Sequence, residues 1–206
     1  MEVLKGVTGA ALLVAAAYSP PARQWYLNHG ATPEEAAATL PGDELLAEPS
    51  LQTTRAITVE AAPESVWPWL VQMGSGRGGA YTYDWIENLF GLNMHSANEI
   101  LPEFQDLAAG DLLPMGEGAP PMRVEICDAA RTLAFRSTDG NWMWSFNLRR
   151  HYLCTRLLSR NRILLRDASR IQRLGFRAVM EPGSLIMERR MLLGIKRRAE
   201  SPVTVR

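Results

Sequence analysis

The sequence predicts an α+β fold in which a curved antiparallel β-sheet packs against a long C-terminal helix. Short runs of alternating apolar and polar residues, separated by Pro-, Gly- and Asp-rich turns, follow one another from residue 107 to residue 160. This pattern is typical of an antiparallel meander. One strand and two short helices precede it, and an amphipathic helical segment closes the chain. Such a sheet has one face to cover, and a single long helix can cover it.

The elements before the meander follow from local patterns. Residues 53–61, TTRAITVEA, are rich in β-branched residues and alternate, which predicts a strand. Pro63 opens a helix whose apolar residues recur at helical spacing up to Val71. A second helix is predicted over residues 82–91. Its apolar residues are expected to share one inward face: Trp85, Ile86, Leu89 and Phe90.

The meander and the last helix complete the fold. The Asp-Gly pair in residues 138–141 predicts a tight hairpin turn between two strands. Residues 184–200 are amphipathic, with Met187, Met191 and Ile195 among the residues that can face inward. Between a curved sheet and one helix there is room for an apolar cavity.

Three glycines have the spacing G-x-G-x-x-G: Gly74, Gly76 and Gly79. A dinucleotide site would need a buried parallel strand before the first glycine and a helix after the last. The preceding segment instead contains Pro68, which a central strand would not tolerate. The glycines are therefore interpreted as a helix end followed by a close-packed loop.

Composition limits the function classes. The 206 residues suit one domain, and 22 basic residues balance 22 acidic ones, which gives no reason to expect a polyanionic partner. Cys127 and Cys154 have no metal or disulfide spacing and indicate a reducing, cytoplasmic compartment. The three histidines share no ligand spacing, so neither a metal nor a cofactor is expected.

The N-terminus divides into two segments before the domain. Residues 1–22 are apolar and admit three interpretations: a membrane anchor, a cleaved signal, or a short helix packed on the domain. Residues 23–50 are predicted to be a lead-in segment, with a helix that starts at Thr32 and Pro33. Residues 51–200 form the predicted domain, and residues 201–206 form a tail.

Three segments resemble a known group of proteins. They are TRAITVEAAPESVWPWLVQMGSGRGGAYTYDWIENLFG, HSANEILPEFQDLAAGD and EPGSLIMERRMLLGIKRRAE. They resemble bacterial members of the SRPBCC superfamily, the START-like group that includes polyketide cyclases and lipid-transfer proteins. The resemblance covers residues 51–200 and implies a helix-grip fold around an apolar cavity. It implies no single reaction, because carriers, cyclases and dehydratases share this scaffold.

The favoured function is binding or carriage of an apolar small molecule or lipid. Aromatic rings supply large apolar areas, and methionine adapts to irregular ligands. Simple core packing is the alternative role for the same side chains. The residues predicted to line the cavity are Trp67, Tyr81, Tyr83, Trp85, Trp142, Trp144, Met187 and Met191.

The alternative function is a cyclase- or dehydratase-like enzyme, so whether the protein is an enzyme is left open. A carboxylate desolvated beside an aromatic ring can have a raised pKa and act as an acid or base. Glu87 belongs to the polar and aromatic cluster that supplies such groups. The catalytic candidates chosen from it and its surroundings are Asp84, His95 and Glu103.

An arginine-rich stretch after the last predicted strand suggests a membrane contact. Its arginines recur at spacings of four and three, which would align them on one face of a helix. A basic amphipathic helix can bind an anionic membrane surface. A solvated helix face, or a strand with outward arginines, is the alternative, and nucleic-acid binding is not expected. The arginines are Arg162, Arg166, Arg170, Arg173 and Arg177.

Overall fold

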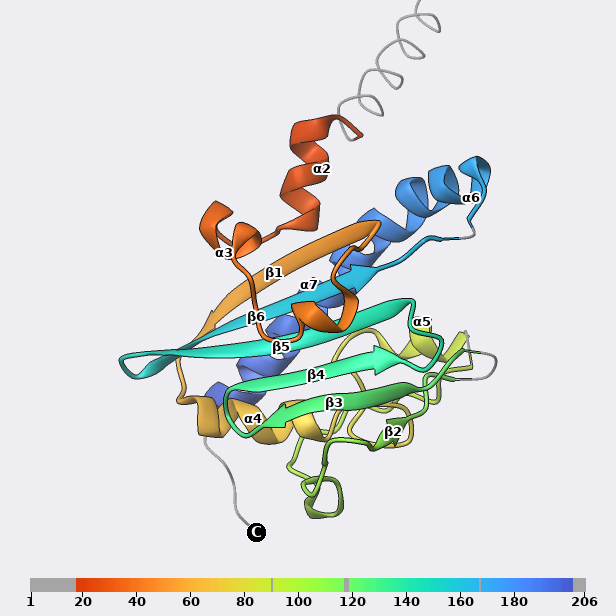
Figure 1. Ribbon diagram of the computed structural model, residues 1–206. Coiled ribbons are helices and arrows are strands. Elements are labelled where there is room, and N and C mark those ends of the chain that lie inside the picture. Colours follow the sequence, from red (N-terminus) through yellow and green to blue (C-terminus); the bar gives the residue numbers. More distant parts are fainter. Residues whose placement is uncertain (1–17, 90, 117–118, 167, 202–206) are drawn as a thin grey trace, which may run out of the picture.

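The protein contains one six-stranded antiparallel sheet with a long helix across one face (Figure 1). The computed structural model describes residues 18–89, 91–116, 119–166 and 168–201. The sheet is curved, and the strand order is β1-β6-β5-β4-β3-β2, so the first strand pairs with the last. This architecture confirms the predicted α+β helix-grip arrangement.

The strands occupy the segments in which alternation predicted them. The hairpin between β4 and β5 contains the predicted Asp-Gly turn, and β1 begins two residues before its predicted start. The strands are β1 (Leu51–Val59), β2 (Leu112–Leu113), β3 (Met122–Asp128), β4 (Thr132–Ser137), β5 (Trp142–His151) and β6 (Cys154–Ile163).

The helices lie on both sides of the sheet. Helix α7 crosses the concave face and contacts β1 and α4, whereas α3 and η1 contact the strands from the opposite, convex face. The helical elements are α2 (Pro20–Leu27), α3 (Pro33–Ala37), η1 (Asp43–Leu46), α4 (Pro63–Val71), α5 (Asp84–Leu89), η2 (Pro102–Phe104), α6 (Arg170–Gly175), the π-helical turn η3 (Phe176–Met180) and α7 (Glu181–Glu200).

The main apolar core lies between the concave face and helices α4 and α7. Alternate residues of a strand point to the same face, and in β5 this places Phe146 and Leu148 in the core. From α7, Met191, Leu192 and Ile195 pack against them. The core therefore fixes α7 at its C-terminal half, where apolar contacts are dense.

The glycine motif forms a turn after α4, as the sequence predicted. Gly74 and Gly79 have positive φ angles of 132° and 72°, and the Gly74 N–H donates to the Gly79 carbonyl at 3.0 Å. A Cβ atom on Gly79 would lie 2.8 Å from the backbone of His95. Glycine is required there because the loop packs directly on another backbone segment.

Residues 23–50, predicted as a lead-in segment, supply part of the packing. Tyr26, Leu27 and Leu40 from this segment are buried. Arg160 on the convex face of β6 is only 1% exposed and donates to Asp43 of η1 at 2.6 Å. Arg160 also donates to backbone carbonyls of residues 35, 36 and 38. The segment is thus tied to the sheet by a buried guanidinium.

Of the predicted apolar segment, residues 1–22, residues 1–17 lie outside the described residues, so its three interpretations stay predictions. Among the residues that are described, no helix has the length and apolar character needed to cross a membrane.

The prediction of five arginines on one helical face was wrong. Arg162 belongs to strand β6, where the pairing of Ile163 with Leu51 fixes the register, and it contacts Asp43. Arg166 follows the strand, and helix α6 begins only after the Ser169 cap. Strand pairing, which the local spacing does not reveal, therefore divides the run. The arginines that remain on helical segments are Arg170, Arg173 and Arg177.

Asp43→Asn should destabilise the protein by about 3 kcal/mol, because it leaves the buried Arg160 guanidinium without its counter-ion. The matched control is Glu125→Gln, which removes the partner of the half-exposed Arg123 and should cost less than about 1 kcal/mol. Urea denaturation of both variants measures the two costs. Equal costs for the two variants would show that the Asp43–Arg160 pair does not tie the segment to the sheet.

Candidate ligand cavity

A cavity of about 480 Å³ lies between the concave face of the sheet and α7. Its walls come from elements far apart in the sequence: β1, β5, β6, α5, η3 and α7. Close-packed interiors leave few voids larger than a water molecule, so a space of this size is a feature of the fold. Most of the lining is apolar, as in Leu51, Leu92, Met94, Met115, Trp142, Trp144, Ile163, Leu164, Phe176, Met180, Met187 and Met191.

Two tryptophans of β5 form the sheet-side wall. The rings of Trp142 and Trp144 stack with centroids 5.9 Å apart and planes 16° apart. Their indole N–H groups donate within the sheet, to Asn161 at 2.8 Å and to Ser159 at 3.0 Å. Because these polar atoms are already bonded, the two side chains offer mainly apolar surface to a ligand.

A buried ion pair joins the sheet to α7 beside this wall. Arg55 of β1, 1% exposed, donates to Glu188 of α7 and to the Tyr26 carbonyl. Glu188 also accepts from Ser159 and Asn161 of β6. Buried charges are tolerated only when fully paired and hydrogen-bonded. This network satisfies that condition, so it holds the helix in place.

Glu87 of α5 is a cavity carboxyl with one oxygen that has no hydrogen-bond partner among the described residues. The residue is 8% exposed, and Oε2 has no partner among the described residues. Burial raises the pKa of Glu87, the neighbouring Thr82 hydroxyl partly lowers it, and the Asp84 carboxylate raises it further. The Thr82 hydroxyl is itself buried without a partner in the described part of the chain.

Four of the eight residues predicted to bind ligand line the cavity: Trp142, Trp144, Met187 and Met191. The other four lie elsewhere. Trp67 packs on the main core, and Tyr81 is buried with its hydroxyl donating to the Trp69 carbonyl at 2.9 Å. The Arg190 guanidinium lies over the ring of Tyr83, 5.5 Å from its centroid.

Trp85 is 67% exposed, which corrects the predicted inward face of α5. Leu89 is also exposed, whereas Glu87, which lies between Trp85 and Leu89 in the sequence, is buried. A helix of six residues has too few turns for its apolar residues to fix which face turns inward. The loops around α5 decide its orientation instead, and they direct Glu87 towards the cavity.

The predicted catalytic residues are not among the cavity-lining side chains. Asp84 accepts from the Ser96 amide at 2.8 Å and from its hydroxyl at 2.6 Å, so it holds a loop. His95 and Glu103 are exposed. No group of three potential metal ligands occurs within the described ranges. The sequence placed Glu87 in the polar cluster, but only the tertiary structure shows that this residue is buried.

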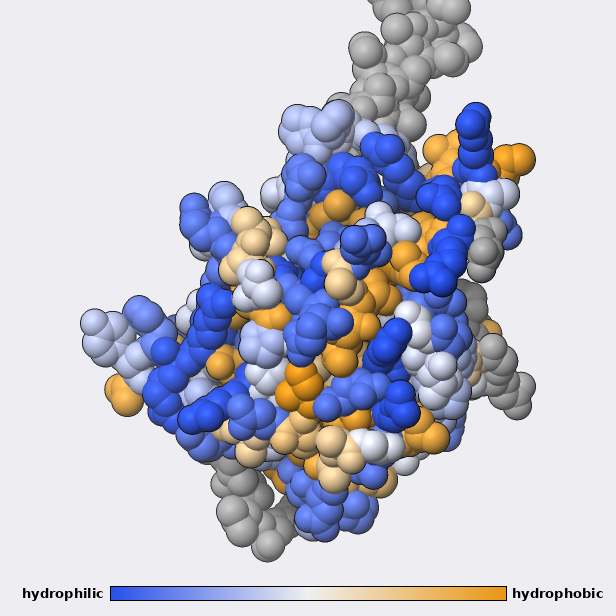
Figure 2. All heavy atoms as spheres, viewed as in Figure 1, coloured by the Kyte–Doolittle hydropathy of each residue, from blue (hydrophilic) through white to orange (hydrophobic). Residues whose placement is uncertain are grey.

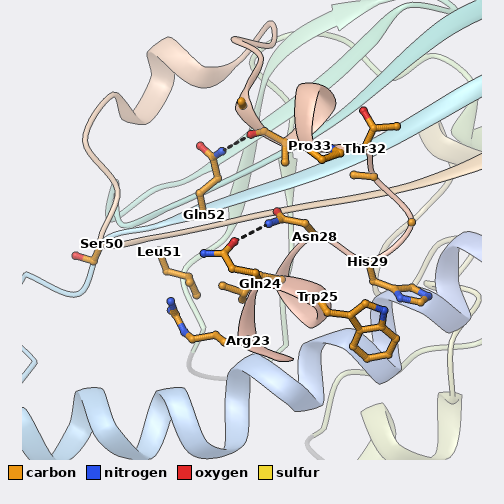
Figure 3. Close-up of a pocket in the computed structure, with 15 residues that line it drawn as sticks. Arg23, Gln24, Trp25, Asn28, His29, Thr32, Pro33, Ser50, Leu51 and Gln52 are labelled. Atoms are coloured by element: carbon orange, nitrogen blue, oxygen red, sulfur yellow. Dashed lines mark hydrogen bonds between the residues drawn. The ribbon is translucent and has the colours of Figure 1, made fainter. Parts of the chain in front are cut away.

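A second, larger hollow lies along the outer edge of β1, between α2 and α3 (Figure 3). Its volume is about 730 Å³, and its lining is more polar than that of the cavity. The amide of Asn28 donates to Gln24 at 3.1 Å, and Gln52 donates to the Ala36 carbonyl at 3.2 Å. Because these amides are already bonded, the apolar cavity is the better candidate for a ligand site.

No family model matches the sequence, and no curated protein matches it. Solved structures similar to this chain include KanY, with 12% identity over 73% of this chain and 98% of that chain, at a TM-score of 0.47. The Aha1 dimer from Colwellia psychrerythraea has 14% identity, covers 73% and 96%, and has a TM-score of 0.43. The Polyketide_cyc-like protein Cgl2372 from Corynebacterium glutamicum has 16% identity, covers 71% and 89%, and has a TM-score of 0.37. Similarities this low assign neither a family nor an activity to the chain.

The raised pKa of Glu87 predicts how its replacement affects stability at different pH values. Above the ordinary glutamate pKa and below the raised folded value, the folded state holds a proton that the unfolded state has released. Glu87 therefore lowers stability as pH rises through this window. Glu87→Gln does not titrate, so its free energy of unfolding relative to wild type should increase as the pH rises above about 4.3, the ordinary pKa of glutamate.

Denaturant titrations across that range measure the difference. Glu87→Leu, which also lacks the carboxyl, is the control and should show the same slope against pH, whatever its absolute stability. A difference that stays constant with pH would contradict a buried, desolvated Glu87.

Proposed function

We propose that the protein binds an apolar small molecule or lipid in the cavity between the sheet and α7. The observation that supports this most directly is a cavity of about 480 Å³ with mainly apolar walls. Ligand sites typically occupy about 300–1,000 Å³ and combine apolar walls with a few polar groups. The stacked Trp142 and Trp144 and the flexible Met187 and Met191 provide such walls from opposite sides.

Binding or carriage is a better supported function than catalysis. A cyclase- or dehydratase-like reaction needs two groups that can act as acid and base and that converge on one point. Glu188 also lines the cavity, but Arg55, Ser159 and Asn161 occupy its oxygens. Glu87 alone favours the cyclase- or dehydratase-like alternative, since a buried carboxyl with a raised pKa can act as an acid or base.

The segment of α6 and η3 supports contact with a membrane surface. Its outward apolar residues include Ile171, which is 84% exposed, and Leu174. Arg170 and Arg177 are exposed on the same segment. Figure 2 shows apolar atoms next to strongly hydrophilic ones at the upper right, where α6 lies. Apolar side chains flanked by cations suit the surface of an anionic bilayer.

The same segment borders the cavity. Phe176 and Met180 of η3 line it, and they follow α6 directly in the chain. A membrane bound at α6 would therefore lie next to one wall of the cavity, where an apolar ligand could pass between them without crossing much water. We propose that the ligand enters from such a surface.

A bulky side chain at a cavity position should block binding. Met187→Trp places an indole in the cavity and should weaken binding of the apolar fluorophore N-phenyl-1-naphthylamine more than about tenfold. The matched control is Ile186→Trp on the exposed face of the same helix, which should change the affinity less than about twofold. Fluorescence titration measures both, and equal affinities for the two variants would overturn the assignment of the cavity.

Native mass spectrometry of the protein purified from its own host tests for the natural ligand. We expect a stoichiometric mass addition that solvent extraction releases as an apolar molecule. Protein that is empty after gentle purification would contradict tight carriage.

Charge reversal tests the membrane contact. Arg170→Glu combined with Arg177→Glu should reduce flotation with phosphatidylglycerol-containing vesicles about tenfold or more, since each basic residue near an anionic surface contributes about 1 kcal/mol. The control, Arg131→Glu combined with Arg149→Glu, changes the net charge equally at exposed positions outside this segment. Equal flotation of both double variants would show that α6 is not the contact surface.

A further inference from the structure

The polar atoms that line the cavity fall into two groups. Most are used within the protein: Arg55 pairs with Glu188, Asn161 donates to Glu188, and Glu181 pairs with Arg23. Such atoms cannot bind a ligand without losing a partner. These paired atoms hold the walls of the cavity in position, so other polar atoms would have to bind a ligand.

Three lining side chains have buried atoms without a partner among the described residues: Thr53 Oγ1, Thr82 Oγ1 and Glu87 Oε2. Thr82 and Glu87 line the same cavity, and no hydrogen bond of ordinary geometry joins the two unpartnered atoms, although the Thr82 hydroxyl is close enough to lower the pKa of Glu87. Thr53 lies on β1, a different wall. The cavity thus has one polar corner made of a carboxyl and a hydroxyl.

An unpaired buried carboxyl destabilises a protein, because it loses its hydration without gaining a partner. An apolar residue of similar size would fill the same place at lower cost. Buried polar groups in native structures almost always have a partner. A molecule that fills the cavity would supply the missing partner of Glu87 and Thr82.

We propose that the ligand is an apolar molecule with one hydrogen-bonding oxygen, a ketone or a hydroxyl, and that Glu87 and Thr82 bind this oxygen. This inference rests on the proposed function and adds the chemical class of the ligand. A carboxylic acid donates its O–H to a ligand oxygen, and the threonine hydroxyl provides a second hydrogen bond. The raised pKa of Glu87 supports the protonated form that such donation requires. The apolar remainder of the ligand lies against the tryptophan and methionine walls.

Two probes of the same shape test this recognition. 2-Acetylnaphthalene has a ketone oxygen, and 2-isopropenylnaphthalene has a CH₂ group in its place. Isothermal titration should show that wild-type protein binds the ketone about tenfold more tightly, because only the ketone satisfies the buried polar groups. Glu87→Leu should keep its affinity for the hydrocarbon and lose the preference for the ketone.

Two threonine variants localise the recognition. Thr82→Val should reduce the preference to about threefold, because one of two hydrogen bonds remains. Thr53→Val, which removes the other unpartnered hydroxyl of the cavity, is the matched control and should leave the preference unchanged. Glu87→Leu without ligand should also unfold about 3 °C higher than wild type, which shows that it folds and that the empty corner is destabilising.

The outcomes separate the two proposals. Binding of both probes with equal affinity to wild type would overturn the inference and leave the apolar cavity as a binding site. Binding of neither probe would overturn the proposed function and the inference with it. A preference for the cation 1-(2-naphthyl)ethylamine over the ketone would also overturn it, because Glu87 would then act as a counter-ion.

Discussion

The buried Arg55–Glu188 ion pair is the interaction on which the arrangement of helix and sheet depends. Apolar contacts hold the C-terminal half of α7, where Met191, Leu192 and Ile195 meet the core. Nearer the start of α7, the Arg55–Glu188 pair holds the helix instead of apolar contacts. Because a buried ion pair must be satisfied by directed bonds, it fixes the distance between β1 and α7 without filling the space beside it. The cavity exists where polar bonds replace close packing.

A second buried arginine works in the same way on the opposite face. Thr54 pairs with Arg160 across β1 and β6, and Arg55 pairs with Ser159 at the next position. Alternation along each strand therefore directs Arg55 to α7 and Arg160 to η1. Arg55 donates to Glu188 of α7 and to the Tyr26 carbonyl of α2, and Arg160 donates to Asp43 of η1 and to the Ala38 carbonyl. The helical segments on the two faces of the sheet are therefore attached at adjacent positions of the β1–β6 pair.

The cavity combines groups with different physical roles. The tryptophan indoles are bonded within the sheet and present apolar faces, and the methionines of α7 can adapt to a ligand. The paired charges maintain the geometry. Glu87 Oε2 and Thr82 Oγ1 have no partner in the described part of the chain, so a ligand that bonds to them would change their energy most. In the proposed binding site, the paired polar groups hold the walls and the corner of Glu87 and Thr82 recognises the ligand.

The fold and part of the site followed from the sequence because they depend on local patterns. Alternation identified the meander, amphipathicity identified α7, and the proline in the segment before Gly74 excluded a dinucleotide site. The same parity placed Trp142 and Trp144 on one face of β5, where they line the cavity.

Non-local contacts decided the rest. The arginine spacing suggested one helix, but pairing of β6 with β1 assigned Arg162 to a strand. The apolar residues of α5 suggested an inward Trp85, but a single short helix is oriented by its surroundings, which bury Glu87 instead. Local sequence determines which elements form, because backbone periodicity is a local property. Only the tertiary structure determines which polar group is left unpaired in a cavity, because pairing depends on residues far apart in the chain.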